Sequence, residues 1–197
     1  MAALFDCASE VVCRFGGTVD KFTGDGLMAL FGAPVALENH AQQACRAALE
    51  ILAAVSDLTD EVADRDGIDV RIRIGLNSGE VVAGEIGSGA GAYTAIGQQV
   101  GMAQRMESVA PPDGVMLSES TARLVESVAE LGEPQAVAIK GAAAPVTARR
   151  LLAISEHAAG VERVDTPLVG RQWEMAAVRG LLDGAVEGRG SVLGVVG

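Results

Sequence analysis

The stretch DKFTGDGLMALFG (Asp20–Gly32) decides which fold the sequence encodes. Two apolar runs, Thr18–Thr23 and Leu27–Phe31, flank Asp25, which stands between two glycines. An Asp-Gly pair between strand-like runs predicts a β-hairpin, because the tight turn requires a positive φ at its centre. By itself this pattern makes the aspartate a turn residue and Lys21 a charge that protects an edge strand from aggregation. Function has to be argued from the other motifs of the chain.

Composition excludes several classes of protein. The net charge of −11 argues against a sequence-independent nucleic-acid binder, which needs a basic face. His40 and His157 lie far apart, which argues against a histidine-based metal site or triad. The three cysteines lack metal-ligand spacing and indicate buried free thiols. A signal-peptide pattern is missing and glycine or charge interrupts every long apolar run, so we expect a soluble cytoplasmic protein.

Hydrophobic periodicity and turn residues divide the chain into helices and strands. We expect helices at 1–15, 38–64, 98–110, 118–128 and 173–186, and further strands at 70–76, 81–82, 93–96, 115–117, 135–139, 146–152 and 191–196. The turn at Asn77–Gly79 predicts that the strands on either side of it form a second hairpin. This order predicts an α+β sandwich with helices on one side of an antiparallel sheet.

The composition changes after Leu152, which predicts a domain boundary. We expect one domain over 1–152, a polar linker over 153–167 that ends in proline, and the start of a second domain over 168–197.

Four separated motifs carry a resemblance to a known family: GTVDKFTGDGLMALFGAP, RIRIGLNSGEVVAGEIG, YTAIGQQVGMAQRMES and IKGAAAPV. Their order and spacing resemble a class III adenylate/guanylate cyclase catalytic domain over Met1 to Leu152. The resemblance implies a ferredoxin-like βαββαβ cyclase sandwich. It also implies that the ribose 3′-hydroxyl of a nucleoside triphosphate attacks the α-phosphate, so that a cyclic monophosphate forms and pyrophosphate leaves. Two Mg²⁺ or Mn²⁺ ions assist this reaction.

The resemblance implies roles for five positions. Asp25 matches the second of two metal-binding aspartates of the family. Lys21 and Thr94 match the pair that contacts adenine, the lysine at N1 and the threonine at the amino group. Threonine in place of the commoner aspartate resembles the subgroup found in bacterial cyclase–ATPase regulators. Arg105 matches the arginine that stabilises the pentavalent phosphate, and Lys140 matches a lysine that contacts the triphosphate.

The chain departs from the family pattern at two places. Gly101 stands where the family usually has an asparagine that orients the ribose. The sequence also begins inside the helix that follows the family's first strand, and that strand carries the first metal aspartate. Asp6 lies on a helix and Asp20 is expected on the strand face opposite Lys21, so neither is expected to replace it. An upstream start and a remnant that folds with a partner chain both remain open explanations.

The segment LVGRQWEMAAVRGLLDGAVEGRGSVLGVVG resembles the start of a P-loop ATPase whose phosphate-binding motif would begin at Gly197. We assign this segment no activity. For the cyclase-like domain two functions remain open. The first is an adenylate cyclase that makes cyclic AMP in intracellular signalling, as a homodimer or as a heterodimer with another cyclase chain. The second is a catalytically degenerate module that binds nucleotide or regulates a partner cyclase.

Overall fold

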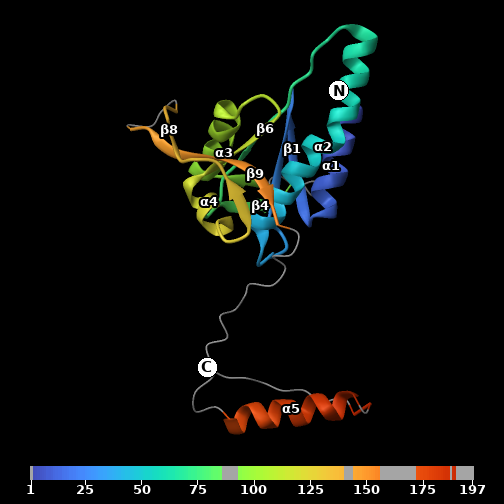
Figure 1. Cartoon of the computed structure of the whole chain (residues 1–197), viewed down its shortest axis with the longest axis vertical. Helices are drawn as coiled ribbons and strands as arrows, with labels where there is room; N and C mark the ends of the chain where they lie inside the picture. The colour runs from blue at the N-terminus through green and yellow to red at the C-terminus, as the bar shows by residue number, and fades with distance from the viewer. Residues whose placement is uncertain (1, 86–92, 140–143, 156–171, 187, 190–197) are drawn as a thin grey trace. The chain divides into compact units, whose positions relative to one another are not determined.

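A computed structural model describes residues 2–85, 93–139, 144–155, 172–186 and 188–189 (Figure 1). The chain divides into two compact units, Met1–Glu156 and His157–Gly197. The expected strand at 191–196 lies outside the described residues.

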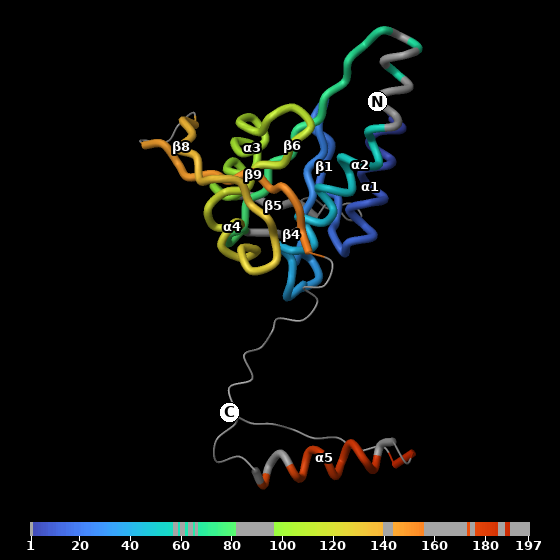
Figure 2. The backbone as a smooth tube through the Cα atoms, viewed as in Figure 1, coloured from blue at the N-terminus to red at the C-terminus, as the bar shows by residue number. Residues whose placement is uncertain are grey.

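The first unit alternates helices and strands, whose course can be followed in the tube of Figure 2. Its elements are α1 (Ala2–Arg14), β1 (Gly17–Thr23), β2 (Gly26–Phe31), α2 (His40–Asp66), β3 (Arg73–Leu76), β4 (Val82–Glu85), β5 (Tyr93–Ile96), α3 (Gln98–Val109), β6 (Gly114–Ser118), α4 (Glu119–Val125), β7 (Ala129–Leu131), β8 (Gln135–Val137) and β9 (Val146–Ile154). The α+β class expected from the sequence is confirmed, while β7 is a strand that the sequence patterns did not predict.

The second unit contains one described helix, α5 (Gln172–Val186), at the place where the sequence predicts one. No helix within the described ranges is both long and apolar enough to cross a membrane.

The hairpin predicted from the opening stretch is confirmed. β1 and β2 pair antiparallel from Gly17 opposite Phe31 to Thr23 opposite Gly26. Gly24 occupies the turn with φ +68°, a conformation that glycine adopts at little steric cost. The pairing register shifts between Val19 and Lys21, so β1 contains a bulge.

The expected second hairpin is wrong. β3 pairs in parallel with β6, and β4 pairs antiparallel with β5. The main sheet has the order β3-β6-β9-β7, with β8 also pairing β9, so one of its pairs is parallel and the others are antiparallel. A bend does follow β3, but β3 pairs with β6, which lies about forty positions later in the chain. Local sequence patterns do not reveal a pairing over this distance.

Strand β6 is the centre of the main core. All five of its residues are buried. Val115 and Leu117 pack against α2 and α4, whereas Met116 packs against α3 from the opposite face. The expectation of helices on one side is therefore wrong, because both faces of β6 are covered.

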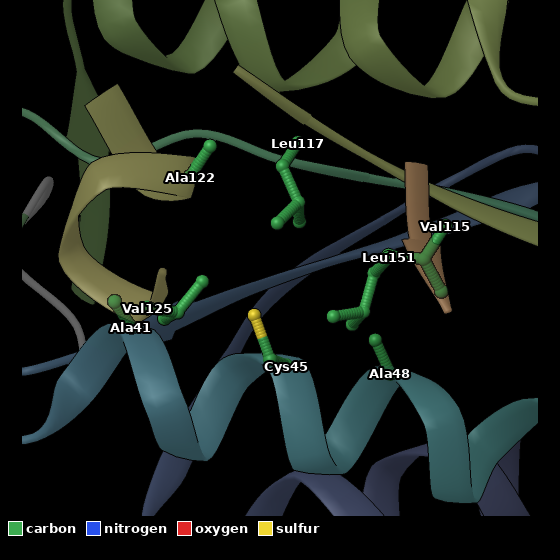
Figure 3. Close-up of a cluster of buried hydrophobic side chains, with 8 residues drawn as sticks. All are labelled: Ala41, Cys45, Ala48, Val115, Leu117, Ala122, Val125 and Leu151. Atoms are coloured by element: carbon green, nitrogen blue, oxygen red, sulfur yellow. The ribbon is translucent and has the colours of Figure 1, made fainter. Parts of the chain in front are cut away.

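The larger of the two packing clusters joins four elements (Figure 3). It contains Ala41, Cys45, Ala48, Val115, Leu117, Ala122, Val125 and Leu151. Small residues on α2 allow this helix to approach β6 and β9 closely. The N-cap of α4 is Ser118, whose hydroxyl accepts a hydrogen bond from the Thr121 amide at 3.4 Å.

The three cysteines are free, as expected, but only Cys45 is buried. Burial raises the pKa of its thiol from 9.0 to about 12. Between those pH values the unfolded thiol ionises while the folded one stays protonated. The contribution of the neutral thiol to stability is therefore complete below pH 9 and declines as the pH rises toward 12.

We expect Cys45→Ala to lower the free energy of unfolding at pH 8, because it removes a buried group. This deficit should shrink by about 1.4 kcal/mol at pH 10, since only the wild type loses stability to thiol ionisation. Urea denaturation at both pH values measures it, with Cys13→Ala at an exposed position as the control. An equal deficit at both pH values would contradict the prediction.

Candidate functional site

The turn between β1 and β2 presents Asp25 to solvent. Gly24 and Gly26 flank it, and a Cβ at Gly24 would meet no atom within 4 Å. The carboxylate is therefore open to an incoming ligand. Carboxylate oxygens suit Mg²⁺, which is commonly bound by one or two carboxylates together with substrate phosphates. Within the described ranges no three His, Cys, Asp or Glu side chains gather as a ready metal cluster, so Asp25 fits a metal as a single ligand.

Lys21 and Thr94 lie on neighbouring elements of the first unit. β1 carries Lys21 and contacts β5, which carries Thr94. Thr94 pairs with Gly84 in the ladder between β4 and β5. Lys140 lies outside the described residues. The fold thus brings together the two strands that carry the expected adenine-contacting residues.

Simple alternation predicts that Asp20 points away from Lys21, but the two charged groups lie close together. The bulge in β1 places Asp20 Oδ2 3.5 Å from Lys21 Nζ. The side chain of Asp20 is only 1% exposed, whereas that of Lys21 is 45% exposed. The sequence expectation was wrong because a bulge adds one residue to a strand and interrupts its period of two.

Arg105 is placed by the close packing of α3 on β3. The two elements touch at Gly75, where a Cβ would lie 2.7 Å from Glu107 Cα and closer still to the Glu107 nitrogen and the Ala103 oxygen. Only a glycine permits this approach. The guanidinium of Arg105 makes no ion pair with the acidic side chains in the described part of the chain, which leaves it available to an anionic substrate.

A polar network that the sequence analysis missed holds the start of α3. Asn77 Nδ2 donates hydrogen bonds to the backbone oxygen and to Oε1 of Gln99, both at 2.9 Å. Asn77 Oδ1 accepts from Ser120 Oγ at 3.2 Å, and Ser120 Oγ also contacts the Ser78 carbonyl oxygen at 2.8 Å. The network ties the end of β3 to α3 and α4. The sequence signal was the Asn-Ser pair, which we interpreted only as a turn.

A second anchor lies at the opposite end of β3. Arg71 Nη1 donates to Asp113 Oδ2 at 2.7 Å, and the Ile72 amide donates to Asp113 Oδ1 at 3.1 Å. The hydrogen bond from Arg71 is the main reason that the pKa of Asp113 lies below its usual value. Both side chains are partly exposed, so solvent screens the pair.

Gly101 lies one turn before Arg105 on α3, and the space beside it is open. A Cβ at position 101 would meet Arg105 Nη1 at 3.9 Å, which is an ordinary contact. Positions 101 and 105, one turn apart, therefore share one face of α3.

We expect Gly101→Ala to stabilise the first unit by about 1 kcal/mol, because glycine is unfavourable inside a helix. Gly101→Asn should in addition raise the turnover number roughly tenfold or more, since the resemblance implies that an asparagine at this position orients the ribose. Urea denaturation measures the change in the free energy of unfolding, and steady-state kinetics of each variant measures the turnover number. Gly101→Ala is the matched control for helix stability, and an equal gain in turnover in both variants would contradict a ribose role for the asparagine.

Comparisons with known proteins identify the family of this chain. The model of a family described as the adenylate and guanylate cyclase catalytic domain matches residues 4–149. Adenylate cyclase 1 of Rhizobium meliloti (strain 1021) is 34% identical over 110 residues, which are 55% of this chain and 16% of that protein. The chain spans less than a fifth of the length of the first curated relatives that it matches.

Two solved structures share the fold. The crystal structure of the guanylyl cyclase Cya2 aligns with a TM-score of 0.72 and 30% identity, over 78% of this chain and 79% of that chain. The adenylyl cyclase CyaB from P. aeruginosa aligns with a TM-score of 0.72 and 25% identity, over 79% and 81% of the two chains. The cyclase sandwich expected from the sequence is therefore confirmed, and relatives of both substrate types are represented. On its fold and on the match over residues 4–149, the chain belongs to the class III adenylate and guanylate cyclase catalytic-domain family.

Proposed function

We propose that the chain converts ATP to cyclic AMP and pyrophosphate. The observation that carries the preference for ATP is Lys21 on β1, with the strand of Thr94 in contact with β1. A lysine ammonium only donates hydrogen bonds, so it suits the N1 acceptor of adenine and not the N1–H donor of guanine. A threonine hydroxyl can accept a hydrogen bond from the adenine amino group.

Arg105 provides the charge for the transition state. As the 3′-oxygen attacks, negative charge accumulates around the α-phosphate. A guanidinium can donate two parallel hydrogen bonds to phosphate oxygens, and such fixed charges are most effective in a site shielded from water. The packing of α3 at Gly75 holds the backbone of Arg105 in place.

Asp25 is the residue that would hold a divalent metal. Its exposed carboxylate between two glycines fits one ligand of Mg²⁺ or Mn²⁺, with phosphate oxygens and water completing the coordination. When bound, the metal would lower the charge on the phosphates and favour ionisation of the 3′-hydroxyl.

The complete site would form between two chains. In the family resemblance, Asp25 of one subunit faces Lys21, Thr94, Arg105 and Lys140 of the other. We propose a homodimer, or a heterodimer with another cyclase chain that supplies further metal ligands to the shared site.

Cyclic AMP formation by the purified chain, from ATP with Mn²⁺ or Mg²⁺, tests this function. We expect product from ATP in excess over cyclic GMP from GTP. Asp25→Ala should lower the rate by at least about 100-fold, because it removes the exposed metal ligand. Asp6→Ala, at an exposed carboxylate on α1, is the matched control and should retain full activity.

A second function is favoured by Gly101 together with the single exposed carboxylate of the hairpin. In this alternative the chain binds adenine nucleotide, or a partner cyclase, without turnover. A folded chain that binds ATP but yields no cyclic AMP would support it. A faster reaction with GTP than with ATP would refute the adenine assignment itself.

A further inference from the structure

Asp20 is a buried carboxylate to which the cyclase reaction as described assigns no role. Its side chain is 1% exposed, and neither of its oxygens accepts a hydrogen bond from the described residues. An unpaired buried charge costs several kcal/mol, so such a group persists only where a nearby charge or a functional need offsets this cost.

The ammonium of Lys21 supplies that nearby charge. Its Nζ lies 3.5 Å from Asp20 Oδ2, which is an ion-pair distance but longer than an ordinary hydrogen bond. The bulge between Val19 and Lys21 interrupts the alternation of β1 at this pair. The next residue, Phe22, packs on Phe5 of α1 with ring centroids 5.4 Å apart, which fixes the strand just beyond the pair.

We propose that Asp20 is a positioning residue for Lys21 and thereby sets the preference for adenine. This inference rests on the proposed function. The carboxylate attracts the ammonium of Lys21 and so restricts the positions that the half-exposed lysine side chain can reach. Without Asp20 the half-exposed lysine would lose this restraint and sample solvent positions.

Asp20→Asn keeps the shape of the side chain and removes its charge. We expect KM for ATP to rise roughly tenfold with little change in kcat, because the contact with the base contributes equally to ground and transition states. The ratio of ATP to GTP turnover should fall by a similar factor.

A double-mutant cycle separates positioning from a general effect on folding. In the Lys21→Ala background, Asp20→Asn should leave KM unchanged, because there is no ammonium to orient. Asp20→Ala serves as a second variant should the asparagine variant fail to fold. A KM for Asp20→Asn equal to that of the wild type, or the same loss with and without Lys21, would overturn the proposal.

A measurement without nucleotide separates this inference from the proposed function. Lys21 and Lys140 are the two lysines of the chain, so Lys140 is an internal reference for acylation followed by mass spectrometry. We expect Asp20→Asn to raise the ratio of Lys21 to Lys140 acylation several-fold, since the ion pair no longer restrains the amine. An unchanged ratio would overturn the inference even in an active enzyme. A raised ratio in a chain that neither binds nor cyclises ATP would confirm the ion pair but overturn the adenine role of both residues.

Discussion

Gly75→Ala should destabilise the first unit by about 3 kcal/mol or more, at the upper end of what overpacking costs. The added Cβ would fall 2.7 Å from Glu107 Cα and closer still to backbone atoms of α3. A flexible side chain could rotate away from such a contact, but helix backbone cannot. The helix must therefore move off β3 as a body, or the strand must lose its pairing with β6.

Since the whole free energy of unfolding of a domain is only about 5–15 kcal/mol, this change should be visible as a large shift of the urea midpoint. Gly101→Ala is the matched control, because it places the same methyl group on α3 where space is open and should raise stability. An unfolding free energy of Gly75→Ala close to that of the wild type would show that the close approach of β3 and α3 is not required.

Arg105→Ala should lower kcat by about 100- to 1,000-fold, the usual cost of losing one group that stabilises transition-state charge. KM for ATP should change much less, because the charge on the α-phosphate grows only during the reaction. Arg105→Lys should recover part of the loss, since a lysine keeps the charge but not the paired donors.

Arg123→Ala offers a matched control for Arg105. Arg123 also lies on a helix, but its side chain is 73% exposed and pairs with Glu119 one turn earlier. Such surface pairs contribute little to stability, so this variant should match the wild type in both kcat and unfolding. An Arg105→Ala enzyme within threefold of the wild-type kcat would remove the arginine from the catalytic machinery.

Elements with local signals could be predicted from the sequence. The hairpin of β1 and β2 follows from a glycine-flanked aspartate between apolar runs, and α3 follows from its periodicity and the prolines after it. The partner of β3 could not be predicted, because a parallel strand pair is joined by a long connection and carries no turn signature. The sequence does contain a signal for the burial of β6 on both faces. Its apolar run is unbroken, which is typical of a strand that is covered on two sides.

For the candidate site, the choice of residues comes from the sequence, and their roles stay predictions. The motif resemblance selects Asp25, Lys21 and Arg105, and the structure leaves the first exposed and the third without an ion pair in the described part of the chain. Two features depend on tertiary placement and lie beyond local reasoning. They are the buried position of Asp20 in a bulge and the bonds from Asn77 to Gln99 across the end of β3. The Thr-type subgroup and the ATPase-like tail stay predictions.

The pairing of β6 also has a consequence for the order in which the molecule folds. The hairpin of β1 and β2 closes across a short turn, a process that takes about 1–10 μs in isolated hairpins. The partners of β6 are distant in the chain on both sides, with β3 some forty residues before it and β9 some thirty residues after it. Such long loops must close before their contacts stabilise anything, which slows folding. The segment that carries Lys21 and Asp25 is thus expected to form early, and the helix that carries Arg105 to dock late, once the sheet that supports it exists.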